Sequence, residues 1–91
     1  MTIHLDGRRM CSRAEAHAYL QEALSLPDYY GKNLDALYDV LTERGEQTEL
    51  VLKHWHALAE QLGGYGISFL ETLREASEEN PRLEVTLTSD N

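Results

Sequence analysis

Three short stretches of the chain carry the apolar pattern of β-strands. Residues 2–6 alternate around Ile3 and Leu5, which predicts a short strand. Residues 50–52, Leu-Val-Leu, are apolar throughout and too few for a helix, which predicts a strand buried on both faces. Residues 83–88 alternate again, so the last strand is expected to have one wetter face.

Four further stretches carry apolar residues at the three- and four-residue spacing of helices that bury one stripe. The first begins at a Ser-x-x-Glu capping box at Ser12. The second is capped by Asn33, which can accept a hydrogen bond from an N–H one turn later, and is expected to stop at Gly45. The third covers about residues 55–62 and the fourth about residues 67–79. The residues assigned to the core are Leu37, Leu41, Leu50, Leu52, Phe69 and Leu73.

The order of these elements is β-α-α-β-α-α-β, so helices connect each strand to the next. Helical crossovers imply parallel strands with right-handed connections, and the fully apolar middle strand belongs at the centre of the sheet. The prediction is an α/β fold with a three-stranded parallel sheet in the order 1-2-3 and four helices. Residues 1–91 are expected to form a single domain, since no repeat or linker-like segment interrupts them.

The 91 residues include 16 acids and 8 bases, which gives a formal net charge of −8. This balance argues against nucleic acid as a direct ligand, because phosphates are neutralised by Lys and Arg, and it favours attraction to cationic proteins. No apolar run reaches membrane-spanning length, and no signal peptide is apparent. The single cysteine, Cys11, cannot form an internal disulfide and is expected to be buried or half-buried. We therefore expect a soluble, cytoplasmic protein with no membrane contact.

Candidate catalytic or metal-binding groups are few. His54 and His56 would point about 200° apart on a helix, which is poor geometry for a metal ion, and the sequence indicates no partner for His4 or His17. No nucleophile, phosphate-binding or zinc-protease motif is present, and residues 63–66, Gly-Gly-Tyr-Gly, are best explained as a helix connection. We expect no cofactor, no metal and no enzymatic activity.

The stretch that points most clearly to a function is residues 28–43. Two tyrosines and Gly31, whose positive φ would allow a tight bend, precede the second helix. Asp35, Asp39 and Glu43 follow at four-residue intervals on one face of that helix, where like charges cost roughly 0.2–0.5 kcal/mol per pair. Either this acidic face is simply solvated, or it forms with the tyrosines a surface for a cationic partner.

Residues 26–39 read Leu-Pro-Asp-Tyr-Tyr-Gly-Lys-Asn-Leu-Asp-Ala-Leu-Tyr-Asp, and this string resembles the signature of the barstar family, small intracellular inhibitors of barnase-type ribonucleases. Chain length, element order and a Leu-Arg-Glu at residues 73–75 also fit, so the resemblance covers essentially the whole chain. It implies an α/β fold. It also implies an acidic surface that mimics phosphates and occludes the basic cleft of the enzyme.

The resemblance also implies a role for individual residues. Asp39 would take the catalytic phosphate position, Asp35 would contact its flank, and Tyr29 would pack on the rim of the enzyme and its catalytic histidine. Glu75 matches an outlying acidic contact. The implied partner is a basic, extracellular-type ribonuclease or toxin nuclease, bound 1:1 by a monomer that acts as its immunity protein. The residues expected to bind this partner are Tyr29, Tyr30, Gly31, Asn33, Leu34, Asp35, Tyr38, Asp39, Thr42 and Glu75.

Some residues depart from the family pattern. Lys32 introduces a positive charge into the acidic motif, Tyr38 replaces a tryptophan, and Glu43-Arg44 replaces a small residue followed by tryptophan. The expected target is therefore barnase or a different ribonuclease of this kind. Two alternatives come from other classes: an acidic protein–protein adaptor with this fold and no nuclease target, and a hydrolase that uses exposed carboxylates.

Overall fold

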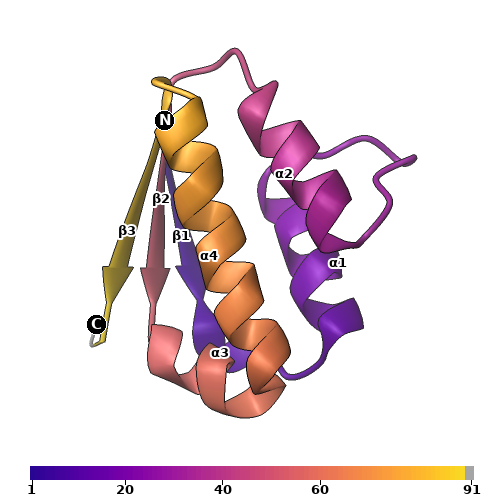
Figure 1. The fold of residues 1–91 in the computed structure, drawn as a ribbon, viewed down its shortest axis with the longest axis vertical. Coiled ribbons are helices and arrows are strands. Elements are labelled where there is room, and N and C mark those ends of the chain that lie inside the picture. Colours follow the sequence, from indigo (N-terminus) through magenta and orange to yellow (C-terminus); the bar gives the residue numbers. More distant parts are fainter. Residues whose placement is uncertain (90–91) are drawn as a thin grey trace.

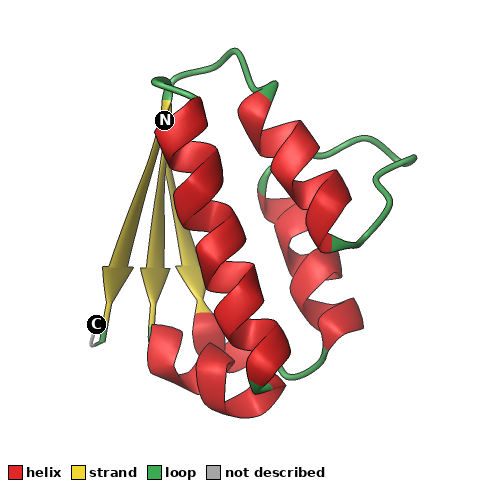
Figure 2. Ribbon diagram, viewed as in Figure 1, coloured by secondary structure: helices red, strands yellow, loops and turns green. Residues whose placement is uncertain are grey.

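Three strands and four α-helices alternate along residues 1–89, the part of the chain that the computed structural model describes (Figure 1). The strands are β1 (Thr2–Asp6), β2 (Thr48–Lys53) and β3 (Leu83–Thr88). The helices are the short 3-10 helix η1 (Gly7–Arg9) and the α-helices α1 (Arg13–Ala23), α2 (Leu34–Thr42), α3 (Trp55–Leu62) and α4 (Gly64–Glu79). This order confirms the predicted α/β fold (Figure 2). None of these helices is long and apolar enough to cross a membrane.

The sheet is parallel throughout and has the predicted order β1-β2-β3. Because both connections between parallel strands are right-handed and the strand order runs in one direction, both connections cover the same face of the sheet. The helices accordingly lie on one side of the sheet (Figure 1). Leu50 faces the helices and is fully buried, whereas Val51 lies between His4 and Thr86 on the other face and is only half-buried. The prediction that the middle strand is buried on both faces is wrong, because only the neighbouring strands shield Val51.

The core fills the space between the sheet and the helices. All six residues assigned to it from the sequence are buried, and none is more than 1% exposed. In β3, Leu83 is buried but Leu87 is 43% exposed, so this strand contributes to the core mainly at its start. Burying an aliphatic or aromatic side chain stabilises the fold by roughly 1.5–3 kcal/mol, which is what holds the helices on the sheet.

The side chain of a residue far along the chain binds carbonyls at the end of α2. The helix stops at Thr42 and not at the predicted Gly45. The side-chain amide of Asn80, just after α4, donates to the carbonyl oxygens of Leu41 and Arg44, each at 2.9 Å. The Leu41 oxygen also accepts from the Arg44 N–H at 3.4 Å, so side-chain and backbone donors together satisfy this helix end.

Glycines bring α3 and α4 close together. Gly63 has a φ of 59°, a left-handed conformation that glycine adopts without strain. α4 then begins at Gly64 and not at the predicted Ile67. Gly66 lies against α3, where a Cβ would stand 2.9 Å from the carbonyl oxygen of Leu58. The glycine-rich segment is a helix connection, as predicted, and its last glycine lets the first turn of α4 pack on α3.

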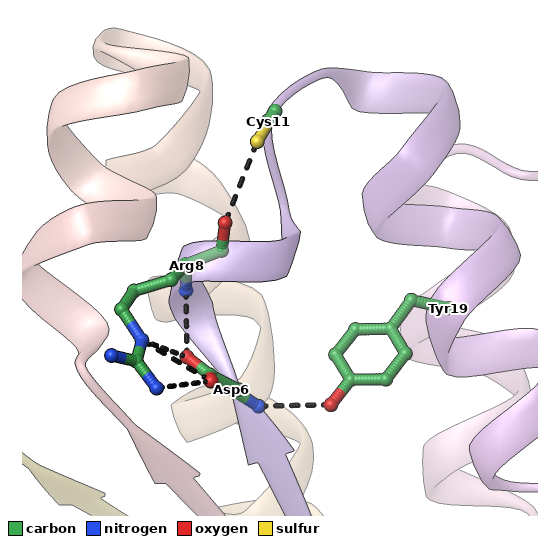
Figure 3. A network of polar contacts seen from close by, with 4 residues as sticks. All are labelled: Asp6, Arg8, Cys11 and Tyr19. Carbon is green, nitrogen blue, oxygen red and sulfur yellow. Dashed lines mark hydrogen bonds and ion pairs between the residues drawn. The ribbon is translucent and has the colours of Figure 1, made fainter.

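A polar network joins β1 to η1 and α1 (Figure 3). The Asp6 carboxylate accepts hydrogen bonds from the guanidinium and the backbone N–H of Arg8 at 2.9–3.2 Å, which holds the pKa of Asp6 at about 2. The Tyr19 hydroxyl of α1 accepts from the Asp6 N–H at 3.0 Å. Cys11 is exposed, with its thiol donating to the Arg8 carbonyl oxygen at 3.4 Å. The prediction that this cysteine is buried is wrong, because it lies in the connection that precedes α1 and its cap, Ser12.

Candidate functional site

The loop before α2 buries one of its two tyrosines and exposes the other. The Tyr30 N–H donates to the Pro27 carbonyl oxygen at 3.0 Å, and the side-chain amide of Gln21 in α1 donates to the same oxygen at 3.0 Å. Tyr30 is 5% exposed, whereas Tyr29 is 87% exposed. The turn therefore directs Tyr29 to solvent and Tyr30 into the molecule.

The bend of this loop lies one residue later than predicted. Lys32 has a φ of 55°, and Gly31 does not have a positive φ. Gly31 contributes in a different way, since a Cβ there would approach the Ala36 Cβ at 3.2 Å and the Asn33 Nδ2 at 3.3 Å, both tight contacts. Gly31 thus allows the loop to pack on the first turn of α2, and Lys32 takes the left-handed conformation, which is unfavourable for a residue with a side chain.

Asn33 joins the loop to α2. Its Oδ1 accepts a hydrogen bond from the Ala36 N–H at 2.7 Å, which confirms the predicted N-cap, and its Nδ2 donates to the Gly31 carbonyl oxygen at 3.3 Å. Replacing such a cap by alanine typically costs about 1 kcal/mol. Since both ends of the amide are used within the chain, Asn33 orients the loop relative to the helix.

A groove lies between α2 and α4, and we call it the acidic groove. It has a volume of about 490 Å³ and is lined by Leu34, Asp35, Tyr38, Asp39, Thr72 and Glu75. Leu37 and Leu41 hold the opposite face of α2 in the core, which leaves Asp35 and Asp39 exposed. Glu75 comes beside them only because α2 packs on α4.

A second groove, the tyrosine groove, lies on the loop side of α2. It has a volume of about 250 Å³ and is lined by Tyr29, Tyr30, Gly31, Ala36, Asp39, Val40 and Glu43. Asp39 lines both grooves. It therefore stands on the ridge between a surface of carboxylates and a surface of aromatic side chains.

The three carboxylates of the acidic groove are exposed to solvent. Within residues 1–89, neither Asp35, Asp39 nor Glu75 forms an ion pair. Arg74 pairs with Glu78 at 2.9 Å, although it is next to Glu75 in sequence. Such a cluster presents a negative field to a cationic partner. No three His, Cys, Asp or Glu side chains in the described part of the chain could together hold a metal ion.

Two of the predicted partner-binding residues line neither groove. Asn33 serves as the cap of α2, and the Thr42 hydroxyl donates to the carbonyl oxygens of Tyr38 and Asp39 at 2.8 and 3.1 Å. The other predicted residues line one groove or both. Their contact with a partner stays a prediction, but the fold gathers them on adjoining surfaces of the loop, α2 and α4.

His17 is a residue of this site that sequence reasoning missed. It is 1% exposed, and its Nδ1 and Nε2 each lie 2.6 Å from a tyrosine hydroxyl, those of Tyr30 and Tyr65. Burial and, secondarily, the charge of Lys32 lower the pKa of His17, and burial raises the pKa of Tyr30. A signal was present, since His17 stands three residues before the buried Leu20 and so falls on the apolar stripe of α1.

The chain is similar to known proteins over most of its length. Residues 1–89 match the model of a protein family described as barstar, the barnase inhibitor. A protein of Bacillus subtilis (strain 168) named "Putative ribonuclease inhibitor YrdF" is 42% identical over 78 residues, which cover 85% of this chain and 86% of that relative. The family match includes the loop, α2 and Glu75.

Proposed function

This chain belongs to the barstar family, and from this membership we propose that it inhibits a ribonuclease by filling the enzyme's active-site cleft with α2, the loop before it and Glu75 of α4. The observation that carries the proposal is the convergence of Asp35, Asp39 and Glu75 around one groove, where none of them forms an ion pair within residues 1–89. An enzyme that cleaves RNA must hold phosphates, so its cleft is rich in Arg, Lys and His. Unpaired carboxylates at matching positions can take the place of those phosphates.

Asp39 is the centre of the proposed contact. From the ridge between the two grooves it can enter a cleft, while Asp35 and Glu75 contact basic residues on one flank. Carboxylates form short, often bidentate hydrogen bonds with arginine, roughly twice as strong as neutral ones. In the described part of the chain these carboxylates form no ion pair, so binding an arginine would not require one to break.

Tyr29 supplies the apolar part of the proposed contact. It is 87% exposed, and its neighbour Tyr30 is held inside the molecule. Tyrosine offers a large contact area with few rotatable bonds and is enriched among the residues that dominate interface energetics. We expect the Tyr29 ring to pack on the rim of the enzyme, and the exposed wall of the tyrosine groove to close around an enzyme side chain.

The proposed partner is a basic ribonuclease, of the barnase type or a related toxin nuclease, bound 1:1. The net charge of −8 favours rapid, salt-dependent association with such an enzyme. Lys32 opposes it, because it adds a positive charge to the loop that would face the enzyme.

The test is a titration of barnase activity with the purified protein at low and high salt. We expect stoichiometric loss of activity at one inhibitor per enzyme, with slower association at high salt. No inhibition of barnase would refute barnase as the target. Absence of any basic nuclease among the partners captured from the source cell would favour the adaptor alternative.

A further inference from the structure

The loop before α2 (residues 24–33) is held from inside the molecule. Its Tyr30 side chain is the first of three side chains, from three separate elements, that contact one another in sequence. Tyr30 of the loop contacts His17 of α1, and His17 contacts Tyr65 of α4, with both oxygen-to-nitrogen distances at 2.6 Å. We infer that Tyr65, acting through His17, is a positioning residue that fixes the loop carrying Tyr29 in its binding conformation. This inference rests on the proposed function, because it assigns a role in that binding surface.

The protons in this chain of contacts can be assigned from burial. A neutral imidazole has one N–H donor and one bare nitrogen acceptor. The Tyr30 hydroxyl is buried, and within residues 1–89 its sole polar partner is the Nδ1 of His17, so its O–H must donate there to be satisfied. His17 therefore carries its proton on Nε2 and donates it to the Tyr65 oxygen. The Tyr65 side chain is only half-buried, so its own O–H can reach water.

Without the Tyr65 hydroxyl, neither position of the His17 proton would satisfy every buried hydrogen-bond donor. If His17 kept its proton on Nε2, that buried N–H would lack an acceptor. If the proton moved to Nδ1, the buried Tyr30 hydroxyl would lose its acceptor instead. One buried donor is left unpaired in either case, and such a donor is costly. The Tyr65 oxygen is thus what gives the His17–Tyr30 contact a single stable arrangement.

Tyr65 is itself well anchored. The guanidinium carbon of Arg13 lies 4.2 Å from the centre of its ring, and Gly66 holds the first turn of α4 against α3. The His17 ring packs against Phe69 of the same helix, with ring centres 5.6 Å apart. The loop is thereby tied to the core, although Tyr65 lines neither groove. Holding a binding loop in place before association reduces the entropy lost on binding.

The test compares Tyr65→Phe with a matched control, Tyr19→Phe. The Tyr19 hydroxyl also accepts one hydrogen bond, from the Asp6 N–H at 3.0 Å (Figure 3), and the guanidinium carbon of Arg9 lies 4.4 Å from its ring centre. Both variants therefore remove one hydroxyl from a half-buried tyrosine under an arginine. Only Tyr65→Phe should affect the loop.

In the free protein we expect Tyr65→Phe to move the ¹⁵N shifts of the His17 ring away from those of a single tautomer. We also expect amide exchange of Tyr30, whose N–H donates to Pro27, to become about fivefold faster or more. Tyr19→Phe should leave both readouts unchanged. Equal ring shifts and equal exchange rates in wild type and Tyr65→Phe would overturn the inference.

The same variants are then measured for binding to barnase. We expect Tyr65→Phe to raise the dissociation constant about 5- to 10-fold and Tyr19→Phe to change it less than about twofold. Equal affinities for wild type and Tyr65→Phe would also overturn the inference. If wild type itself did not bind barnase, barnase would fail as the proposed target, while the tautomer and exchange readouts of the free protein would still decide the role of Tyr65.

Discussion

We expect mild acid to destabilise this fold through His17. Both ring nitrogens of this buried histidine are in hydrogen bonds, and the Tyr30 O–H donates to one of them. A protonated ring would need acceptors on both sides, so its bond with Tyr30 would have to rearrange. Within residues 1–89, the charged groups and hydroxyls that face the ring are Lys32 and Tyr30 from the loop and Tyr65 from α4, and none of them is a carboxylate that could stabilise the imidazolium.

The sign and size of this effect follow from the lowered pKa of His17. Because the pKa in the folded state lies below the ordinary value of 6.5, the unfolded chain binds the proton first as the pH falls. The contribution of His17 to stability is therefore complete above pH 6.5 and is lost as the pH falls from 6.5 toward the folded-state pKa. Over that window the free energy of unfolding should fall by up to about 1.4 kcal/mol per pH unit. Below the folded-state pKa the loss should stop.

The measurement is urea unfolding of wild type and His17→Gln at pH 7.5, 6.5 and 5.5. Glutamine retains a polar side chain but does not titrate. The carboxylates are the same in both proteins, so their contribution cancels in the difference between the two free energies of unfolding. We expect wild type to be more stable at pH 7.5, and this advantage to shrink by up to about 1.4 kcal/mol per unit below pH 6.5. A constant difference across the three pH values would refute the reasoning.

Three further substitutions test the packing around the site. Gly66→Ala should destabilise by about 1–3 kcal/mol in urea unfolding, because the new Cβ would stand 2.9 Å from the Leu58 carbonyl oxygen, whereas Gly64→Ala, with no neighbour within 4 Å, should not destabilise. Asn80→Ala should cost about 1–3 kcal/mol, since the Asn80 amide donates to two carbonyls at the end of α2, and equal unfolding midpoints would contradict this. Lys32→Asn, at a φ of 55° that asparagine tolerates better, should stabilise by up to about 1 kcal/mol and, by stopped-flow mixing, should speed association with a basic ribonuclease.

Much of the fold could be predicted from the sequence, because its strands and helices carry local apolar patterns. The order β-α-α-β-α-α-β was enough to predict a parallel sheet with β2 at its centre. The open face of that sheet could not be inferred from Leu-Val-Leu at residues 50–52. An apolar residue at the middle position is compatible with shielding by the neighbouring strands alone and equally with cover by a second layer of helices. The contact at the end of α2 could not be inferred either, because the amide that binds the Leu41 carbonyl belongs to Asn80, 39 residues further along the chain.

The candidate site likewise combines residues that a local sequence pattern reveals with residues that only the packing of distant elements brings together. Asp35, Asp39 and Tyr29 belong to one continuous motif. The exposure of the two aspartates follows from the helical register of α2, and that of Tyr29 from the turn before it. Glu75 could be assigned only through family resemblance, since its position beside Asp39 depends on how α4 packs. The contact between His17 and Tyr65 joins residues 48 positions apart, so no local pattern indicates it.

The measurement that tests the account most directly is the affinity of Asp39→Asn for barnase, compared with Glu84→Gln. Each variant removes one exposed negative charge, but Glu84 lies on β3, outside both grooves. Removing one partner of a buried, hydrogen-bonded charge pair costs at least about 2 kcal/mol, so Asp39→Asn should raise the dissociation constant roughly 30-fold or more. Glu84→Gln should change only the association rate, and only slightly. Equal losses for both variants would contradict the proposal, because the net charge, and not the ridge at Asp39, would then account for binding.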